Sequence, residues 1–171
     1  MPAISTILSI ENVGYNQTAV RNLTLLSKAS EVIRDFNQKN IEFLVLKGLY
    51  LAFDIYPDIG LRPMTDVDFL IKREDLDRVE KILFQLGYYD VSPKAQRSYG
   101  CDVTFCNKDG IFIDIHWDLC QYERFRGIIN ITPDFWKRAR EFNLDGMCPQ
   151  TLSIEDHILY ISLHTCPNWT A

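Results

Sequence analysis

The spacing of apolar side chains predicts that helices and strands alternate along the chain. Between residues 18 and 40, apolar residues recur at the three-to-four-residue interval of an amphipathic helix. Residues 41–46 (IEFLVL) then form a short apolar run that is typical of a buried strand. A short helix is expected over residues 49–56, because Pro57 cannot continue it. This part of the sequence therefore predicts helix, strand and helix in turn.

The middle of the chain predicts a second strand, a helix and a hairpin. Residues 66–71 (DVDFLI) have strand character, and residues 74–86 have helical periodicity with Gly87 in the position of a C-terminal cap. After an irregular polar stretch come two alternating segments, CDVTFCN and IFIDIHWDL. The turn between them, KDG, contains the Asp-Gly pair that favours a tight antiparallel hairpin.

Two more helices are expected near the end of the chain. One covers residues 133–142, and the other follows Ser153, a suitable N-cap residue with acidic residues in the first turn behind it. The order α-β-α-β-α-β-β-α-α predicts an α/β (α+β) fold with a mixed sheet flanked by helices. We expect residues 1–150 to form the main domain and residues 151–171 to begin a small helical C-terminal region, which is either compact or truncated.

Composition narrows the class of protein. A chain of 171 residues, 47% of them hydrophobic, has the size and core material of one globular domain. The net charge of −5 argues against broad nucleic-acid binding through phosphate contacts. Five cysteines without a CxxC pair argue against a disulfide framework and against zinc. The N-terminal segment lacks a basic start and a long apolar run, so we expect a cytoplasmic protein.

Two aspartates interrupt the strand expected at residues 66–71. Side chains alternate between the two faces of a strand, so Asp66 and Asp68 share one face, and Val67 and Phe69 lie on the other. Neighbouring like charges repel, and a divalent cation between them reverses that cost. Carboxylate oxygens are ligands that Mg²⁺ or Mn²⁺ prefers. The alternative is a solvated sheet edge with incidental acids.

A third carboxylate has the same relation to its strand. In IFIDIHWDL, one face carries Ile113, Ile115, Trp117 and Leu119, whereas the other carries Phe112, Asp114, His116 and Asp118. Three carboxylates on neighbouring strands can hold two metal ions roughly 3.5–4 Å apart, the arrangement used for in-line phosphoryl displacement. An exposed strand acid is the alternative for Asp114, and a hydrogen-bonded strand histidine is the alternative for His116.

A basic turn and a basic loop complete the candidate site. Lys47-Gly48 joins a strand to a helix, where glycine permits close backbone approach and the first amides can face a phosphate. Arg62 precedes Pro63 in the loop before the acidic strand, where it can clamp a phosphate or pair with an acid to brace the loop. For His157 and His164 on the last helix we expect packing or solvent exposure.

These segments together resemble a known family. LVLKGLYLAFDIYPDIGLRPMTDVDFLI, a following helix, LGYY and IFIDIHWDL are similar to the ordered motifs of a nucleotidyltransferase family within the polymerase-beta-like superfamily. The resemblance covers about residues 20–165. It implies a nucleotidyltransferase-like fold, with Asp66 and Asp68 as the metal-binding pair and Asp114 as the third carboxylate that helps to activate the acceptor hydroxyl.

The resemblance also implies a reaction. The enzyme would move an NMP group from an NTP to an unidentified acceptor (a small molecule, a protein or an RNA end), with Mg²⁺ or Mn²⁺ as cofactor and pyrophosphate as product. Lys47, Gly48, Arg62 and His116 would contact the nucleotide. Most of the superfamily has serine after this glycine, but here Leu49 follows Gly48. A catalytically silent nucleotide-binding or regulatory module of the same fold therefore stays open, as does hydrolysis or transfer of a phosphate.

Overall fold

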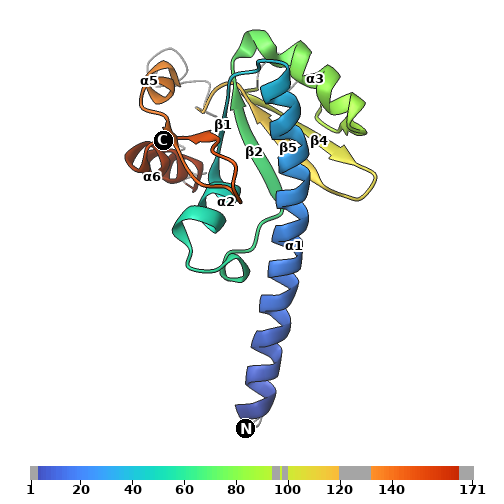
Figure 1. Cartoon of the computed structure of the whole chain (residues 1–171), viewed down its shortest axis with the longest axis vertical. Coiled ribbons are helices and arrows are strands. Elements are labelled where there is room, and N and C mark those ends of the chain that lie inside the picture. Colours follow the sequence, from blue (N-terminus) through green and yellow to red (C-terminus); the bar gives the residue numbers. More distant parts are fainter. Residues whose placement is uncertain (1–3, 94–96, 98–99, 120–131, 166–171) are drawn as a thin grey trace, which may run out of the picture.

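A long N-terminal helix extends out of an otherwise compact domain. The computed structural model describes residues 4–93, 97, 100–119 and 132–165, and it is shown in Figure 1. Helix α1 (Ile4–Gln38) packs its C-terminal half on the sheet, whereas its N-terminal half projects away from the other elements. The helix begins well before residue 18, the predicted start. Residues 4–17 contain no proline, and Gly14 is their only glycine, so the helical backbone can continue through them.

The centre of the domain is a seven-stranded mixed sheet, which confirms the predicted fold class. Its order is β3-β4-β5-β2-β1-β7-β6. Strand β2 pairs in parallel with β5 and antiparallel with β1. The strands are β1 (Phe43–Val45), β2 (Asp66–Ile71), β3 (Tyr88–Asp90), β4 (Asp102–Asn107), β5 (Phe112–His116), β6 (Arg140–Glu141) and β7 (Gln150–Thr151).

The remaining helices are short, and most begin or end where the sequence predicts. Gly87 has a φ of +84°, which suits the C-terminal cap expected after the third helix. The helical elements after α1 are α2 (Lys47–Tyr50), the π-helical turn η1 (Leu51–Ile55), the 3₁₀ turns η2 (Ile59–Leu61) and η3 (Arg73–Asp75), α3 (Leu76–Gln85), α5 (Thr132–Lys137) and α6 (Ile154–Thr165). The expected N-cap is present, since the Asp156 backbone N–H donates to Ser153 Oγ at 3.2 Å.

Each face of the sheet has its own apolar cluster. The larger cluster joins α1 and α3 to the face that carries Val67, Phe69 and Ile113. The smaller cluster joins α5 and α6 to the opposite face, and its members are Leu44, Leu46, Leu70, Leu119, Phe135, Leu152 and Tyr160. Figure 1 shows α1 and α3 on one side of the sheet and α6 on the other. The polar side chains of β2 and β5 therefore lie on the α6 side.

Three local predictions need correction. The first two concern short strands that the sequence did not predict, and the third concerns the position of Leu119. The helix expected over residues 133–142 ends at Lys137, because residues 140–141 pair with β7 as strand β6. Strands β3 and β7 were not predicted, since two or three residues are too few to show a period. Leu119 was expected on the same face as Ile113, but it belongs to the opposite cluster because β5 ends at His116.

The predicted hairpin is present. The Asn107 N–H donates to the Ile111 carbonyl at 3.1 Å, and Gly110 has a φ of +72°. Cys101 and Cys106 are buried and Cys148 is exposed, while Cys120 and Cys166 lie outside the described residues. Among the helices of the described residues, none has the length and apolar character that a membrane span requires.

Candidate active site

The pairing of β2 with β5 brings two of the predicted carboxylates side by side. Asp68 lies opposite Asp114 in the parallel register, and Asp66 lies opposite Phe112 at the beginning of both strands. Asp68, Asp114 and His116 each offer a ligand atom within 4.8 Å of the others. Asp66 is outside this group of three, although it lines the same pocket as Asp68. The fold thus collects the predicted acids on one face of the sheet.

Asp68 is buried and ionised. Its Oδ1 accepts a hydrogen bond from Lys47 Nζ at 2.7 Å and lies 3.0 Å from His116 Nε2. Burial acts to raise the pKa of this carboxyl, but His116 and Lys47 outweigh burial and hold the pKa at about 2. Asp68 therefore carries its negative charge at neutral pH.

The negative charges of Asp114 and Asp66 are less well compensated than the charge of Asp68. Burial raises the pKa of Asp114, the Thr104 hydroxyl lowers it, and the charge of Asp68 raises it further. Burial and the charge of Asp68 raise the pKa of Asp66 as well. Asp114 Oδ1 is buried and lacks a hydrogen-bond partner among the described residues. Such an atom costs free energy unless a ligand satisfies it.

A divalent cation fits this donor set. Two carboxylates and an imidazole converge within 4.8 Å, and one of the oxygens, Asp114 Oδ1, is buried and unpartnered. Carboxylate oxygens suit Mg²⁺, and the added imidazole nitrogen also suits Mn²⁺. The residues that could hold the ion are therefore Asp68, Asp114 and His116. Asp66 lies outside this group, in the wall of the pocket that Asp68 also lines.

A pocket of about 340 Å³ opens beside these acids. Its walls come from the α2 turn, the loop before β2, the start of β2 and the last helix. The lining residues are Lys47, Gly48, Leu51, Arg62, Pro63, Met64, Thr65, Asp66, Asp68, Ile161 and His164. Four of the predicted site residues, Lys47, Gly48, Arg62 and Asp66, thus share one cavity with Asp68. Asp114 and His116 lie next to Asp68 in the sheet rather than in the pocket wall.

An unusual backbone conformation positions Lys47. Its φ of +40° is uncommon for a residue other than glycine. The Lys47 N–H donates to His157 Nε2 at 3.2 Å, and the His157 ring stacks on Tyr50 with centroids 4.4 Å apart. Burial lowers the pKa of His157 to about 4, so the ring stays neutral and can accept this bond. The Lys47 amide, expected to be free for phosphate, is therefore already bound.

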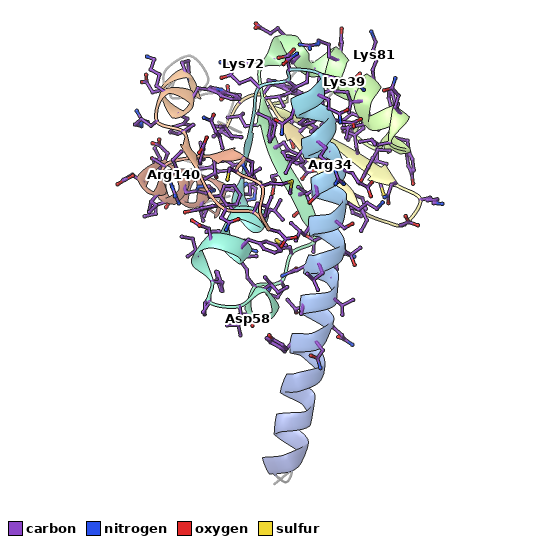
Figure 2. The ribbon with its side chains drawn as sticks, viewed as in Figure 1. Arg34, Lys39, Asp58, Lys72, Lys81 and Arg140 are labelled. Atoms are coloured by element: carbon purple, nitrogen blue, oxygen red, sulfur yellow. The ribbon has the colours of Figure 1, made fainter. Side chains whose placement is uncertain are left out.

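Tyr50 and His157 are braced in turn by an arginine. Arg140, labelled in Figure 2, donates to the Tyr50 hydroxyl and to Asp54 Oδ2, the latter at 3.1 Å. The histidine that holds Lys47 is thus part of a packed network that joins β6, α2 and α6. The expectation that His157 serves packing agrees with this contact.

Gly48 and Arg62 meet at the mouth of the pocket. A Cβ added to Gly48 would lie 3.2 Å from Met64 Sδ, so a larger residue here would press on the wall. Arg62 Nη1 donates to the Pro63 carbonyl at 2.9 Å, and no carboxylate pairs with it among the described residues. The Arg62 side chain thus lies at the pocket without a bracing acid, one of the two alternatives that the sequence left open.

Two site-forming groups were not predicted. Asn22 on α1 is fully buried, and its amide donates to the carbonyls of Ile59 and Arg62 at 2.5 and 2.8 Å, which fixes the loop before β2. On α6, Tyr160 and His164 join the site from one helix face. The spacing of residues 157, 160, 161 and 164 is the i, i+3, i+4, i+7 pattern of one face, and this pattern was the available signal.

Among the other basic side chains, Arg21 on α1 reaches the pocket wall by donating to the Thr65 carbonyl at 2.9 Å, whereas several lysines lie far from the pocket. Figure 2 shows Lys39, Lys72 and Lys81 at the end of the domain opposite the projecting part of α1, whereas Asp58 lies in the loop near that part. Lys39 follows α1 and Lys72 follows β2, so both mark the sheet end away from Asp66. Lys47 and Arg62 are the basic residues among the pocket walls.

Comparison with known proteins identifies the relatives of this chain. A family model described as "Uncharacterised nucleotidyltransferase" matches residues 12–169. A comparison with curated proteins finds no significant match. Two solved proteins share the fold. The lincosamide antibiotic adenylyltransferase LnuA, in its lincomycin-bound crystal structure, is 14% identical with a TM-score of 0.55, over 78% of this chain and 83% of that one.

The second protein is the antibiotic-resistance factor ANT(2'')-Ia. Its solution structure is 16% identical with a TM-score of 0.60, and the match covers 86% of this chain and 77% of that one. Its crystal structure in complex with adenylyl-2''-tobramycin is 17% identical with a TM-score of 0.57, over 85% and 81% of the two chains. At these identities the likeness shows the fold.

Proposed function

Because the chain belongs to the family described as uncharacterised nucleotidyltransferases, we propose that it transfers an NMP group from an NTP to an acceptor hydroxyl and releases pyrophosphate. The observation that carries the proposal is the group of Asp68, Asp114 and His116 beside a pocket with two basic side chains. A small-molecule acceptor is the class we favour, because the structural relatives are named as antibiotic adenylyltransferases or hold an adenylylated antibiotic.

Each site residue has a place in this reaction. Asp68 and Asp114 would hold a divalent ion, Mg²⁺ or Mn²⁺, with Asp66 at the pocket edge as a further ligand. When bound, the ion neutralises charge on the phosphates. Lys47 and Arg62 line the pocket, where their positive charges would bind and orient the triphosphate. Gly48 lines the same pocket, and the absence of a side chain at this position would let a ligand approach the backbone closely.

Asp114 is the residue that we assign to the acceptor. Its carboxyl has a raised pKa, and its Oδ1 lacks a partner, so it can accept the proton of an attacking hydroxyl. His116 contacts Asp68 and orients that carboxylate. Positioning and charge neutralisation supply most of the rate in phosphoryl transfer, so little covalent chemistry is required of the protein.

Isotope labelling tests the reaction. With NTP labelled at the α-phosphate, label should pass to an acceptor, while label at the γ-phosphate should leave only in pyrophosphate. At saturating Mn²⁺, Asp114→Asn should lower kcat by about 10²–10³-fold, a larger loss than in nucleotide binding, because its proton-accepting role is strongest in the transition state. Lys137→Ala, an exposed change on α5, is the matched control and should leave transfer unchanged.

Two outcomes would replace the proposal. Movement of γ-label to the acceptor would identify a kinase. Nucleotide binding without movement of either label, across a broad panel of aminoglycoside, lincosamide, protein and RNA acceptors, would favour the silent binding module. Leu49, buried after Gly48 where most of the superfamily has serine, is the observation that keeps this second function in view.

A further inference from the structure

Lys47 and Asp68 form a nearly buried ion pair at the centre of the site. Their atoms Nζ and Oδ1 are 2.7 Å apart, and the side chains are only 16% and 3% exposed. A buried carboxylate is costly unless a positive charge compensates it. His116 contacts the same oxygen at 3.0 Å. Lys47 thus places a basic group directly against the Asp68 carboxylate.

The fold places Lys47 between two possible partners. The bond from its amide to His157 and its positive φ fix the backbone, while its Nζ lies 5.3 Å from the centre of the Tyr160 ring. The same side chain lines the pocket with Arg62 and Met64. Its ammonium group therefore has Asp68 on one side and the open pocket on the other.

Charge forbids a lysine and a divalent ion on the same carboxylate oxygen at close range. Two positive groups about 4 Å apart repel, because the effective dielectric of a protein screens them less than water does. We propose that Lys47 is an exchangeable counter-ion, which neutralises Asp68 in the metal-free protein and turns to the nucleotide phosphates when the metal binds. This inference rests on the proposed function, because it assumes that Asp68 ligates a divalent ion.

The exchange has a thermodynamic consequence. Binding of the metal must displace Lys47 from Asp68, so the lysine lowers the intrinsic metal affinity of the empty site. A bound phosphate that receives the lysine removes this penalty, and by linkage the metal then favours the phosphate to the same degree. Lys47 would thereby favour the loading of metal and nucleotide together.

Binding of Mn²⁺ alone to the full chain, measured by the electron paramagnetic resonance signal of free Mn²⁺, tests the proposal. Lys47→Met should bind Mn²⁺ at least about tenfold more tightly than the wild type, because it removes the competing charge. Lys47→Arg should stay near the wild type. The control is Lys28→Met, which removes the same charge from a pair with Glu31 on α1, at a distance of 2.9 Å, outside the site.

Thermal unfolding provides a second readout. Lys47→Met leaves Asp68 without its cation, so the variant should have a lower Tm than the wild type in EDTA and a larger rise in Tm with Mn²⁺. If Lys47→Met does not fold without metal, Lys47→Gln is measured instead, since its amide keeps a hydrogen bond to Asp68 without the charge.

An unchanged or weaker Mn²⁺ affinity in the uncharged variants would overturn the proposal, and so would a wild type and variants that all fail to bind Mn²⁺. A gain in affinity that persists when Asp68→Asn is added would also overturn it, since the effect would not act through Asp68. None of these readouts needs turnover. If label transfer fails but Lys47→Met still binds Mn²⁺ more tightly through Asp68, the reaction is wrong and the exchange stands.

Discussion

Acidic side chains in two regions of this protein have opposite surroundings. Asp156 on α6 is 5% exposed, and both of its carboxylate oxygens accept hydrogen bonds from Arg138, at 2.9 and 2.8 Å. Asp68 and Asp114 on the sheet lie side by side, and Asp114 Oδ1 has no partner among the described residues. One acid is fully paired by its own chain, whereas the other two repel each other.

The difference in pairing distinguishes a carboxylate that stabilises the fold from the carboxylates of the candidate site. A carboxylate that serves the fold is paired inside the fold, because an unpaired buried charge would destabilise it. The site acids keep an unsatisfied oxygen at Asp114, and the pKa values of Asp66 and Asp114 are raised, features that are typical of functional sites. The same chemical group can therefore stabilise the protein or leave a charge uncompensated, according to its partners.

The same substitution at the two places should have opposite effects, and this is the largest effect that we expect. Asp114→Asn should raise the Tm of the metal-free protein by a few degrees, because it removes a repelling charge and adds an amide that can donate to Asp68. It should lower Mn²⁺ affinity by at least about 100-fold and abolish the rise in Tm with metal. Differential scanning fluorimetry with EDTA or Mn²⁺ measures both changes.

Asp156→Asn is the matched control for that prediction. It should lower the Tm in EDTA, because Arg138 loses its ionised partner, and the shift with Mn²⁺ should remain. A normal metal response in Asp114→Asn would place the ion elsewhere, and a lost response in Asp156→Asn would remove the contrast between the two regions.

His157 should make stability depend on pH, with an effect of intermediate size. Its pKa of about 4 in the folded protein lies below its ordinary value of 6.5, so between these values the unfolded chain binds the proton more readily. Stability should therefore fall as pH drops from 6.5 to 4, by roughly 3 kcal/mol. Urea unfolding at several pH values, compared with His157→Gln, measures this contribution.

Protonation of Asp66 and Asp114 should oppose the loss of stability that His157 causes at low pH. The folded pKa values of Asp66 and Asp114 are raised above 3.8, so their protonation on acidification relieves repulsion and adds stability. Asp68, whose pKa is about 2, loses its contribution only as pH falls from about 4 through 2. The difference between the wild type and His157→Gln isolates the histidine, and equal profiles for both would contradict its buried neutral state.

The smallest effect is expected at the start of α6, the helix that carries both Asp156 and the site-facing Tyr160. Ser153→Ala removes the N-cap acceptor and should cost about 1 kcal/mol in urea unfolding, with little change in Mn²⁺ affinity. Ser30→Ala, inside α1 where Ser30 Oγ donates to the Leu26 carbonyl, is the control and should be neutral or slightly stabilising. Equal losses in the two variants would mean that Ser153 does not act as a cap.

Much of the fold could be predicted from local signals. The period-two pattern of residues 66–71 placed strand β2 at its observed bounds, and the Asp-Gly turn placed the hairpin between β4 and β5. Gly87 and Ser153 marked helix ends through backbone and capping preferences. These signals are local because they depend on the conformation of a few consecutive residues. The domain division at residue 150 and the cytoplasmic location stay predictions.

The shortest strands and the register between β2 and β5 have no signal in the local sequence. Strands β6 and β7 exist because they pair with each other and with β1, and two residues cannot show a period. The sequence named Asp66, Asp68 and Asp114 by their strand faces and by a family resemblance, but it could not give the parallel register that sets Asp68 against Asp114. That register decides which carboxylates meet, and their assignment to a metal stays a prediction.

The amino-acid sequence by itself determined which side chains share a strand face, since alternation is a property of the extended backbone. Only the tertiary structure decided their partners. Lys47 reaches Asp68 across 21 positions, and His157 holds the Lys47 amide across 110, through contacts that no local pattern encodes. Pairing over such distances depends on the packing of whole elements, so the charge balance of the site emerges only when the sheet and α6 come together.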